Sequence, residues 1–283
     1  MPSKHTIAVG QYHELPVVKF VDFGLYLAAG EDEILLPTRY IPAGTEVGDR
    51  LWVFIYRDSE DRIIATTTKP KAVVGEFAGL QVVATTKFGV FLDWGLEKDL
   101  LVPFSEQYER MVVGKTYLVR VIADRETDRV IATARLRDYL DYSSFPIAEG
   151  EAVELLVWEF TQIGVKVIIN DRYEGLLYQN EVFTDLPVGS RVTGYVKQVR
   201  PDGKVDVTLR KQGYGEIADA MNLILEKLEQ SGGFLPLTDD SKPEEIQQSL
   251  DMSKKTFKKA IGGLYKERKI LLQPDGIRLI ASE

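Results

Sequence analysis

Three copies of one short pattern constrain this chain more than any other feature of its sequence. An apolar residue, a glycine and an alternating pair of side chains recur at residues 23–27, 88–92 and 163–167. The glycine of a Val-Gly pair follows each repeat glycine after 24, 25 and 25 residues, and a threonine follows after a further 18, 19 and 19. These landmarks are Gly24, Gly89 and Gly164, then Gly48, Gly114 and Gly189, then Thr66, Thr133 and Thr208. Concordant intervals in three copies indicate a tandem repeat of one folded unit.

Each copy is predicted to form a small β-barrel. The segments at 51–56, 117–122 and 192–199 are rich in β-branched and aromatic residues, which favour strands. Polar turns typical of hairpins separate the last two strands of each copy. About five short strands in about 65 residues favour a closed barrel of the OB class, because closure removes exposed sheet edges.

After residue 211 the pattern changes from β to helical. Gly232 and Gly233 are expected to end a first helix, whose apolar residues recur at three- and four-residue steps. These residues are Ile217, Met221, Ile224, Leu225 and Leu228. Ser241 and Glu244 have the spacing of a capping box, which predicts a second helix through Leu250.

A third helix and a hairpin complete this C-terminal segment. Ser253 is predicted to cap the helix, with a buried stripe of Phe257, Ile261 and Leu264, and with Tyr265 alongside. The apolar segments 270–272 and 277–280 flank a Pro-Asp-Gly turn and predict a two-stranded wing. Three helices and a hairpin in this order resemble a winged helix.

The composition is that of a folded protein without a metal site. A hydrophobic share of 45% and a charged share of 28% over 283 residues fit two to four compact domains. The absence of cysteine excludes disulfides and thiolate metal sites, and only His5 and His13 are left for zinc, so no cofactor is expected. No stretch approaches the roughly 20 apolar residues of a membrane span, and the first residues lack an apolar signal core. We therefore expect a cytoplasmic location.

The net charge of −8 argues against a protein that coats nucleic acid by bulk electrostatics. The third predicted helix is an exception, because residues 252–270 hold seven basic side chains and one acid, whereas residues 214–251 hold two and nine. We expect a local RNA contact there, with a solvated or protein-docking face as the alternative. The candidate contacts are Lys254, Lys255, Lys258 and Lys259.

The repeat motifs resemble the S1 RNA-binding domain, an OB-fold module. They combine Phe-Gly-x-aromatic-aliphatic with Leu-Leu-Pro or Leu-Leu-Tyr, then Val-Gly and a hairpin. Three such modules before a winged helix resemble the bacterial conserved virulence factor B family across nearly the whole chain. This resemblance implies single-stranded RNA binding and control of bacterial gene expression, including that of virulence factors.

The resemblance also points to residues for RNA contact in the first two copies. Aromatic rings there are expected to stack on bases, and burial in the barrel core is the alternative. The rings are Phe23, Tyr26, Phe88 and Phe91, and the nearby lysines expected to meet phosphates are Lys19 and Lys87. Trp52, Trp94 and Trp158 are interpreted as packing residues.

The three copies depart from the S1 pattern at one shared position. Many S1 domains carry a histidine after the third strand, whereas Pro37, Pro103 and Tyr178 stand at the matching positions here. The third copy also has Ile163 and Lys166 where the others have aromatics. Its face is therefore expected to depend more on charge, with Lys166 and Tyr178 as candidate contacts.

These observations predict three OB-type barrels at 1–71, 72–146 and 147–213, and a winged-helix domain at 214–283. Binding of single-stranded RNA is the leading hypothesis for function. A DNA-binding regulator that uses the winged helix, or a protein-interaction adaptor, remains open. Catalysis is not expected: Gly114-Lys115-Thr116 resembles a phosphate-binding loop, but Glu109 stands where that motif needs glycine.

Overall fold

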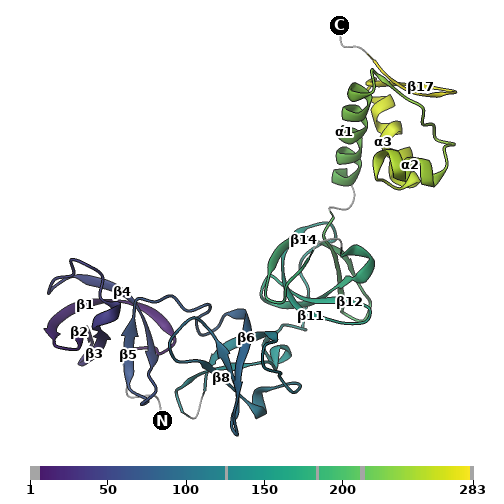
Figure 1. Ribbon diagram of the computed structural model, residues 1–283. Helices are drawn as coiled ribbons and strands as arrows, with labels where there is room; N and C mark the ends of the chain where they lie inside the picture. Colours follow the sequence, from purple (N-terminus) through teal and green to yellow (C-terminus); the bar gives the residue numbers. More distant parts are fainter. Residues whose placement is uncertain (1–6, 125–126, 183–184, 211–213, 281–283) are drawn as a thin grey trace. The chain divides into compact units, whose positions relative to one another are not determined.

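The computed structural model describes residues 7–124, 127–182, 185–210 and 214–280 (Figure 1). The chain divides into two compact units. The first contains residues 1–145, 154–193 and 200–205, and the second contains residues 146–153, 194–199 and 206–283. The strands of the third barrel belong to both units.

Three five-stranded barrels follow one another along the chain, as predicted. The first closes in the order β1-β2-β3-β5-β4, with β1 (Gln11–Val21), β2 (Gly24–Ala29), β3 (Asp32–Pro37), β4 (Arg50–Arg57) and β5 (Ile63–Thr66). The second has the order β10-β9-β6-β7-β8, with β6 (Phe77–Thr85), β7 (Gly89–Asp93), β8 (Leu100–Pro103), β9 (Thr116–Ala123) and β10 (Val130–Thr133). Its end strands β8 and β10 lie side by side. The third closes in the order β11-β12-β13-β15-β14, with β11 (Ala152–Phe160), β12 (Gly164–Ile169), β13 (Tyr173–Tyr178), β14 (Arg191–Val199) and β15 (Val205–Thr208).

Short 3-10 helices accompany the barrels. One follows the third strand of each barrel, at η1 (Thr38–Tyr40), η2 (Phe104–Glu106) and η4 (Gln179–Glu181). Another, η3 (Leu136–Tyr139), comes after the last strand of the second barrel.

Close backbone packing requires the first glycine of each repeat. Gly24, Gly89 and Gly164 begin the second strand of their barrels. A Cβ atom on any of them would lie 2.1–2.3 Å from a carbonyl oxygen of the third strand, whereas real Cβ atoms essentially never come within 3.0 Å of another heavy atom. The second and third strands of every barrel therefore approach each other at this end in a way that only glycine permits.

Recurring hydrogen bonds explain the other two landmarks of the repeat. The amide of Gly48 donates to the carbonyl oxygen of Val17 at 2.9 Å, and the other two barrels repeat this bond at 2.8 Å. The closing threonines are buried, and each Oγ1 accepts a hydrogen bond of 3.0–3.1 Å from the amide two residues later. These threonines are Thr66, Thr133 and Thr208. The sequence intervals thus record the pairing of equivalent backbone positions.

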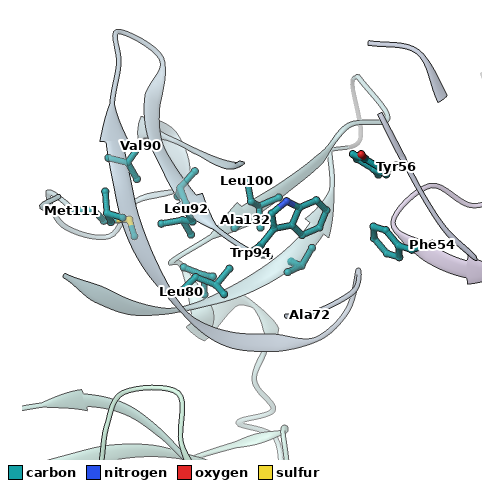
Figure 2. Close-up of a cluster of buried hydrophobic side chains, with 14 of the residues drawn as sticks. Phe54, Tyr56, Ala72, Leu80, Val90, Leu92, Trp94, Leu100, Met111 and Ala132 are labelled. Carbon is teal, nitrogen blue, oxygen red and sulfur yellow. The ribbon is translucent and has the colours of Figure 1, made fainter. Parts of the chain in front are cut away.

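Residues 53–56 of strand β4 are buried on both faces of the strand. Val53 and Ile55 belong to the core of the first barrel, whereas Phe54 and Tyr56 pack in a cluster with the second barrel. The Phe54 ring meets Trp94 edge-on, with centroids 5.7 Å apart. Figure 2 shows Trp94 between these two side chains and the apolar side chains of the second barrel. Full burial of a large apolar side chain contributes roughly 1.5–3 kcal/mol, so this cluster stabilises the junction of the two barrels.

Polar contacts reinforce this junction at the turn between β4 and β5. The Arg129 guanidinium donates two hydrogen bonds of 3.0 Å to the Asp61 carboxylate, which lowers the pKa of Asp61. The Lys98 ammonium donates to the carbonyl oxygen of Asp58 at 2.6 Å, and burial lowers the pKa of Lys98. Both cations come from the second barrel, so the hairpin of the first barrel is tied to it.

A separate buried cluster joins the second and third barrels. Phe77, Leu118 and Leu136 from the second barrel pack against Leu156 and Ile168 from the third. The domain boundaries expected after residues 71, 146 and 213 stay a prediction.

The C-terminal residues form the predicted winged helix, in which the first and third helices contact a small sheet and the second helix packs against both of them. Its elements are α1 (Tyr214–Gln230), β16 (Phe234–Leu235), α2 (Pro243–Leu250), α3 (Lys254–Lys266), β17 (Ile270–Gln273) and β18 (Gly276–Leu279), and the sheet order is β16-β18-β17. Phe257, Ile261 and Leu264 are buried, as expected for the third helix. The amide of Thr256 donates to Ser253 Oγ at 3.1 Å, which confirms the predicted cap.

Two features of the winged helix differ from the sequence interpretation. The capping box lies one residue later than predicted, because Glu245 Oε2 accepts from the amide of Lys242 at 3.2 Å. Ser241 Oγ instead accepts from the amide of Thr238, which places it in the preceding turn. Strand β16 was not predicted, since two residues are too few to show strand periodicity.

Two aromatic side chains are more exposed than the sequence suggested. Trp52 was interpreted as a packing residue, but it is 64% exposed and stacks on Tyr12 with centroids 6.0 Å apart. Tyr265 lies beside the buried stripe of α3 in sequence, yet its side chain is exposed. Trp94 is buried, in agreement with its predicted role.

We predict that Gly24→Ala destabilises the chain by about 3 kcal/mol, near the upper end of overpacking costs, because the clashing atom is backbone. Gly44→Ala in the same barrel is the control. Gly44 has a φ of +80° but nothing within 4 Å of a built Cβ, so a loss of about 1 kcal/mol is expected from backbone strain alone. Urea unfolding measures both losses, and equal values would contradict the close-packing explanation.

Candidate nucleic-acid interface

The residue before each repeat glycine carries an outward-pointing side chain. Phe23, Phe88 and Ile163 are 59%, 64% and 62% exposed. The carbonyl oxygen of each accepts a hydrogen bond of 3.1–3.2 Å from the first residue of the 3-10 helix that follows the third strand. The backbone is therefore fixed while the side chain faces solvent, and this geometry is the same in all three barrels.

The first barrel combines aromatic rings with one lysine. Lys19 lies opposite Tyr26 in the β1–β2 pair, and its Nζ is 5.0 Å from the Tyr26 ring centroid. Glu33 accepts a hydrogen bond of 2.5 Å from the same ammonium group, so the charge of Lys19 is partly neutralised. Phe20 is also exposed, and the sequence interpretation missed it.

The second barrel carries the corresponding arrangement with a different lysine. Lys87 Nζ lies 5.0 Å from the centroid of the Phe88 ring, and Phe91 is half-buried on β7. Phe104, whose amide donates to Phe88 at 3.2 Å, is exposed beside it. Phe104 was also missed, because it follows the S1-like motif instead of lying within it.

The third barrel has a different face, and its expected dependence on charge stays a prediction. Lys166 lies opposite Glu159 in the β11–β12 pair, and the two side chains form an ion pair of 2.7 Å. Arg200 donates a hydrogen bond of 3.4 Å to the Tyr178 hydroxyl. Phe160 is exposed near the end of β11 and was not singled out from sequence. Charge on this face is thus largely paired.

The strand register confirms that one position in the three copies is equivalent. Pro37, Pro103 and Tyr178 pair with the repeat glycines Gly24, Gly89 and Gly164 across the second and third strands. These are the positions where many S1 domains carry histidine. The backbone pairing at this position is therefore the same in all three barrels, whereas the side chain differs in the third.

The basic residues of α3 lie on more than one side of the helix. Lys255, Lys258 and Lys259 are exposed, and Lys254 is half-buried. Lys258 lies 3.5 Å from Asp239, whereas Lys254, Lys255 and Lys259 form no ion pair with any residue that the structure describes. Residues 255 and 259 are one turn apart and share a helix face, so they are the candidate pair for phosphate contact.

The described ranges contain no group of three His, Asp or Glu side chains arranged to hold a metal ion. Likewise, among helices within these ranges, none has both the length and the apolar character needed to cross a membrane. Thr116 begins strand β9 directly after Gly114 and Lys115, so these residues do not open a helix as a phosphate-binding loop would.

Family comparisons cover both ends of the chain. An S1 domain family model matches residues 9–68, and a family model described as a CvfB-like winged helix domain matches residues 222–279. The Bacillus subtilis protein YitL is 30% identical over 271 residues, which cover 92% of this chain and 90% of YitL. Conserved virulence factor B of Staphylococcus aureus strain USA300 is 24% identical over 241 residues, which cover 83% and 80%. The chain belongs to the conserved virulence factor B family.

A solved structure from Streptococcus pneumoniae, described as a multidomain protein with nucleic acid binding domains, is 23% identical. It covers 96% of this chain and 99% of its own chain, with a TM-score of 0.44. Membership of the conserved virulence factor B family confirms the resemblance seen in the sequence. The S1 and winged-helix matches together indicate nucleic-acid binding.

We predict that Glu33→Gln increases RNA affinity, because it frees the Lys19 ammonium from its ion pair. If Lys19 then meets a phosphate, the slope of log affinity against log salt steepens by about 0.7, the value for one phosphate of a single strand. Glu31→Gln removes the same charge from the neighbouring turn and is the matched control. Fluorescence anisotropy with labelled single-stranded RNA measures both quantities, and an equal gain in the control would assign the effect to overall charge.

Proposed function

We propose that this protein binds single-stranded RNA and acts as a post-transcriptional regulator of bacterial gene expression, including expression of virulence factors. The barrels contribute stacking contacts, and α3 contributes phosphate contacts. The protein acts in the cytoplasm as a binding protein without catalytic chemistry. Its contacts lie on one chain, so the second and later contacts become intramolecular and increase the overall affinity.

One observation carries this proposal. Phe23 and Phe88 occupy equivalent positions in two barrels, are more than half exposed, and precede a glycine that fixes the local backbone. An exposed large ring costs hydration free energy unless a ligand covers it, and each base offers a flat apolar face to such a ring. Lys19 and Lys87, each 5.0 Å from a ring of its own barrel, supply charge where the sugar-phosphate backbone would pass.

The overall charge of the chain supports a localised mode of binding. A net charge of −8 disfavours contacts spread over the whole surface, whereas α3 presents Lys255 and Lys259 without ion-pair partners among the described residues. Stacking on the barrels is only weakly salt-dependent, and phosphate contact at α3 is strongly so. The two kinds of contact are therefore separable by experiment.

We predict that Phe88→Ala weakens binding of single-stranded RNA by roughly 1–3 kcal/mol, the worth of one stacked base. Folding is expected to be unchanged, because the ring is largely exposed. Val113→Ala removes another exposed apolar side chain from the same barrel and serves as the control. Anisotropy titrations at fixed salt give the affinities. Unchanged affinity in a folded Phe88→Ala variant would remove this ring from the binding face.

A second prediction concerns α3. The double variant Lys255→Glu with Lys259→Glu should reduce RNA affinity and flatten the salt slope by about 0.7 for each phosphate that the helix no longer binds. Lys227→Glu with Lys242→Glu makes the same charge change elsewhere in the winged helix and is the control. Titrations over a series of salt concentrations measure the slopes. Weaker binding with an unaltered slope would rule out direct phosphate contact at α3.

A further inference from the structure

A cavity of about 510 Å³ lies where the second and third barrels pack together. Four aromatic side chains line it: Tyr108 and Tyr117 from the second barrel, and Trp158 and Phe160 from β11 of the third. Tyr108 and Phe160 are exposed, whereas Tyr117 and Trp158 are half-buried. The volume falls within the range of about 300–1,000 Å³ that is typical of small-ligand sites.

Close packing fixes the walls of this cavity. A Cβ atom on Gly189 would lie 2.4 Å from the Cα of Gly79, so the backbones of the two barrels touch there. Val188, next to Gly189, is part of the cavity wall. At the same junction, Arg137 donates hydrogen bonds of 3.1 and 3.2 Å to Glu174 of the third barrel. The cavity is therefore preformed.

Charges around the cavity are balanced. Three cations and three acids line it: Arg135, Arg137, Lys166, Glu109, Asp138 and Glu159. Lys166 pairs with Glu159 at 2.7 Å, and Arg135 pairs with Asp138 at 3.1 Å. Paired charges attract a phosphate only weakly. The lining thus suits a flat, uncharged ring better than an anion.

The indole of Trp158 occupies a position that is special to the third barrel. It stands at a β-bulge in β11, where the equivalent bulges of the first two barrels hold Val18 and Val83. Lys166 Nζ lies 5.5 Å from the Trp158 ring centroid. The indole N–H donates to no acceptor within the described part of the chain. A half-buried indole that lines a cavity and carries a free donor is a suitable partner for a nucleobase.

We propose that this cavity binds one base of a single-stranded RNA, stacked on Trp158 and bordered by Tyr108. The inference rests on the proposed RNA-binding function and adds a site to it. Lys166 belongs both to the cavity lining and to the face of the third barrel, so a strand crossing that face reaches the cavity. The third barrel, which lacks an aromatic at residues 163 and 166, obtains its stacking ring from the bulge of β11 instead.

Three variants of the full chain test this site with a labelled single-stranded RNA oligonucleotide. Trp158→Leu keeps an apolar side chain but removes the ring, so affinity should fall at least fivefold, about the effect of one weak stack. Trp158→Phe should retain most of the affinity. The salt slope should stay unchanged in both, because neither variant alters a group that binds phosphate. Trp52→Leu, which removes an exposed indole from the first barrel, should have no effect.

Tryptophan fluorescence gives a direct readout of stacking. The emission of Trp158 is obtained by subtracting the spectrum of Trp158→Phe from that of the unaltered chain. This emission should be quenched when unlabelled RNA is added. Normal RNA affinity in Trp158→Leu without this quenching would overturn the cavity site and leave the proposed function intact. Normal affinity without quenching is also the result expected if the cavity binds a protein segment instead of a base. A flattened salt slope, or an equal loss in Trp52→Leu, would overturn it too. Failure of the unaltered chain to bind RNA would instead refute the proposed function.

Discussion

A glycine α-carbon lies against a carbonyl oxygen of the neighbouring strand in every barrel, and this contact governs the geometry of the candidate interface. Gly24, Gly89 and Gly164 permit an approach that no side chain would allow. The residue before each glycine is then held by a backbone hydrogen bond, with its side chain directed to solvent. Packing of the barrel and presentation of Phe23 and Phe88 are therefore consequences of the same local geometry.

The repeat was readable from sequence because it records backbone pairing that recurs within each barrel. The amide of Gly48 donates to the carbonyl oxygen of Val17, and the other two barrels repeat this bond. The sequence intervals are therefore kept even where the side chains differ. The junction between barrels was not predicted. The run of four apolar residues from Val53 to Tyr56 does break the alternation of a half-buried strand, which favours burial on two faces. This run does not identify the residue that packs against Phe54, because Trp94 comes from a different barrel.

The candidate site was predictable in part for similar reasons. Phe23 and Phe88 stand inside the repeated motif, and the structure places both at the surface. The ion pair of Lys166 with Glu159 depends on strand register, which a β-bulge shifts by one residue. The same bulge directs Trp158 to the junction cavity. Sequence periodicity alone does not locate a bulge, so this part of the interface became visible only in three dimensions.

The proposed binding of single-stranded RNA through stacking and local charge can be tested directly. The most direct test compares the affinities of this chain for single-stranded RNA, single-stranded DNA and duplex DNA of one sequence at one salt concentration. We expect single-stranded RNA to bind more tightly than duplex DNA, since bases in a single strand are free to stack on the exposed rings. Tightest binding of duplex DNA would contradict it and favour a DNA-binding regulator. Absence of binding to all three would contradict it and favour a protein-interaction adaptor.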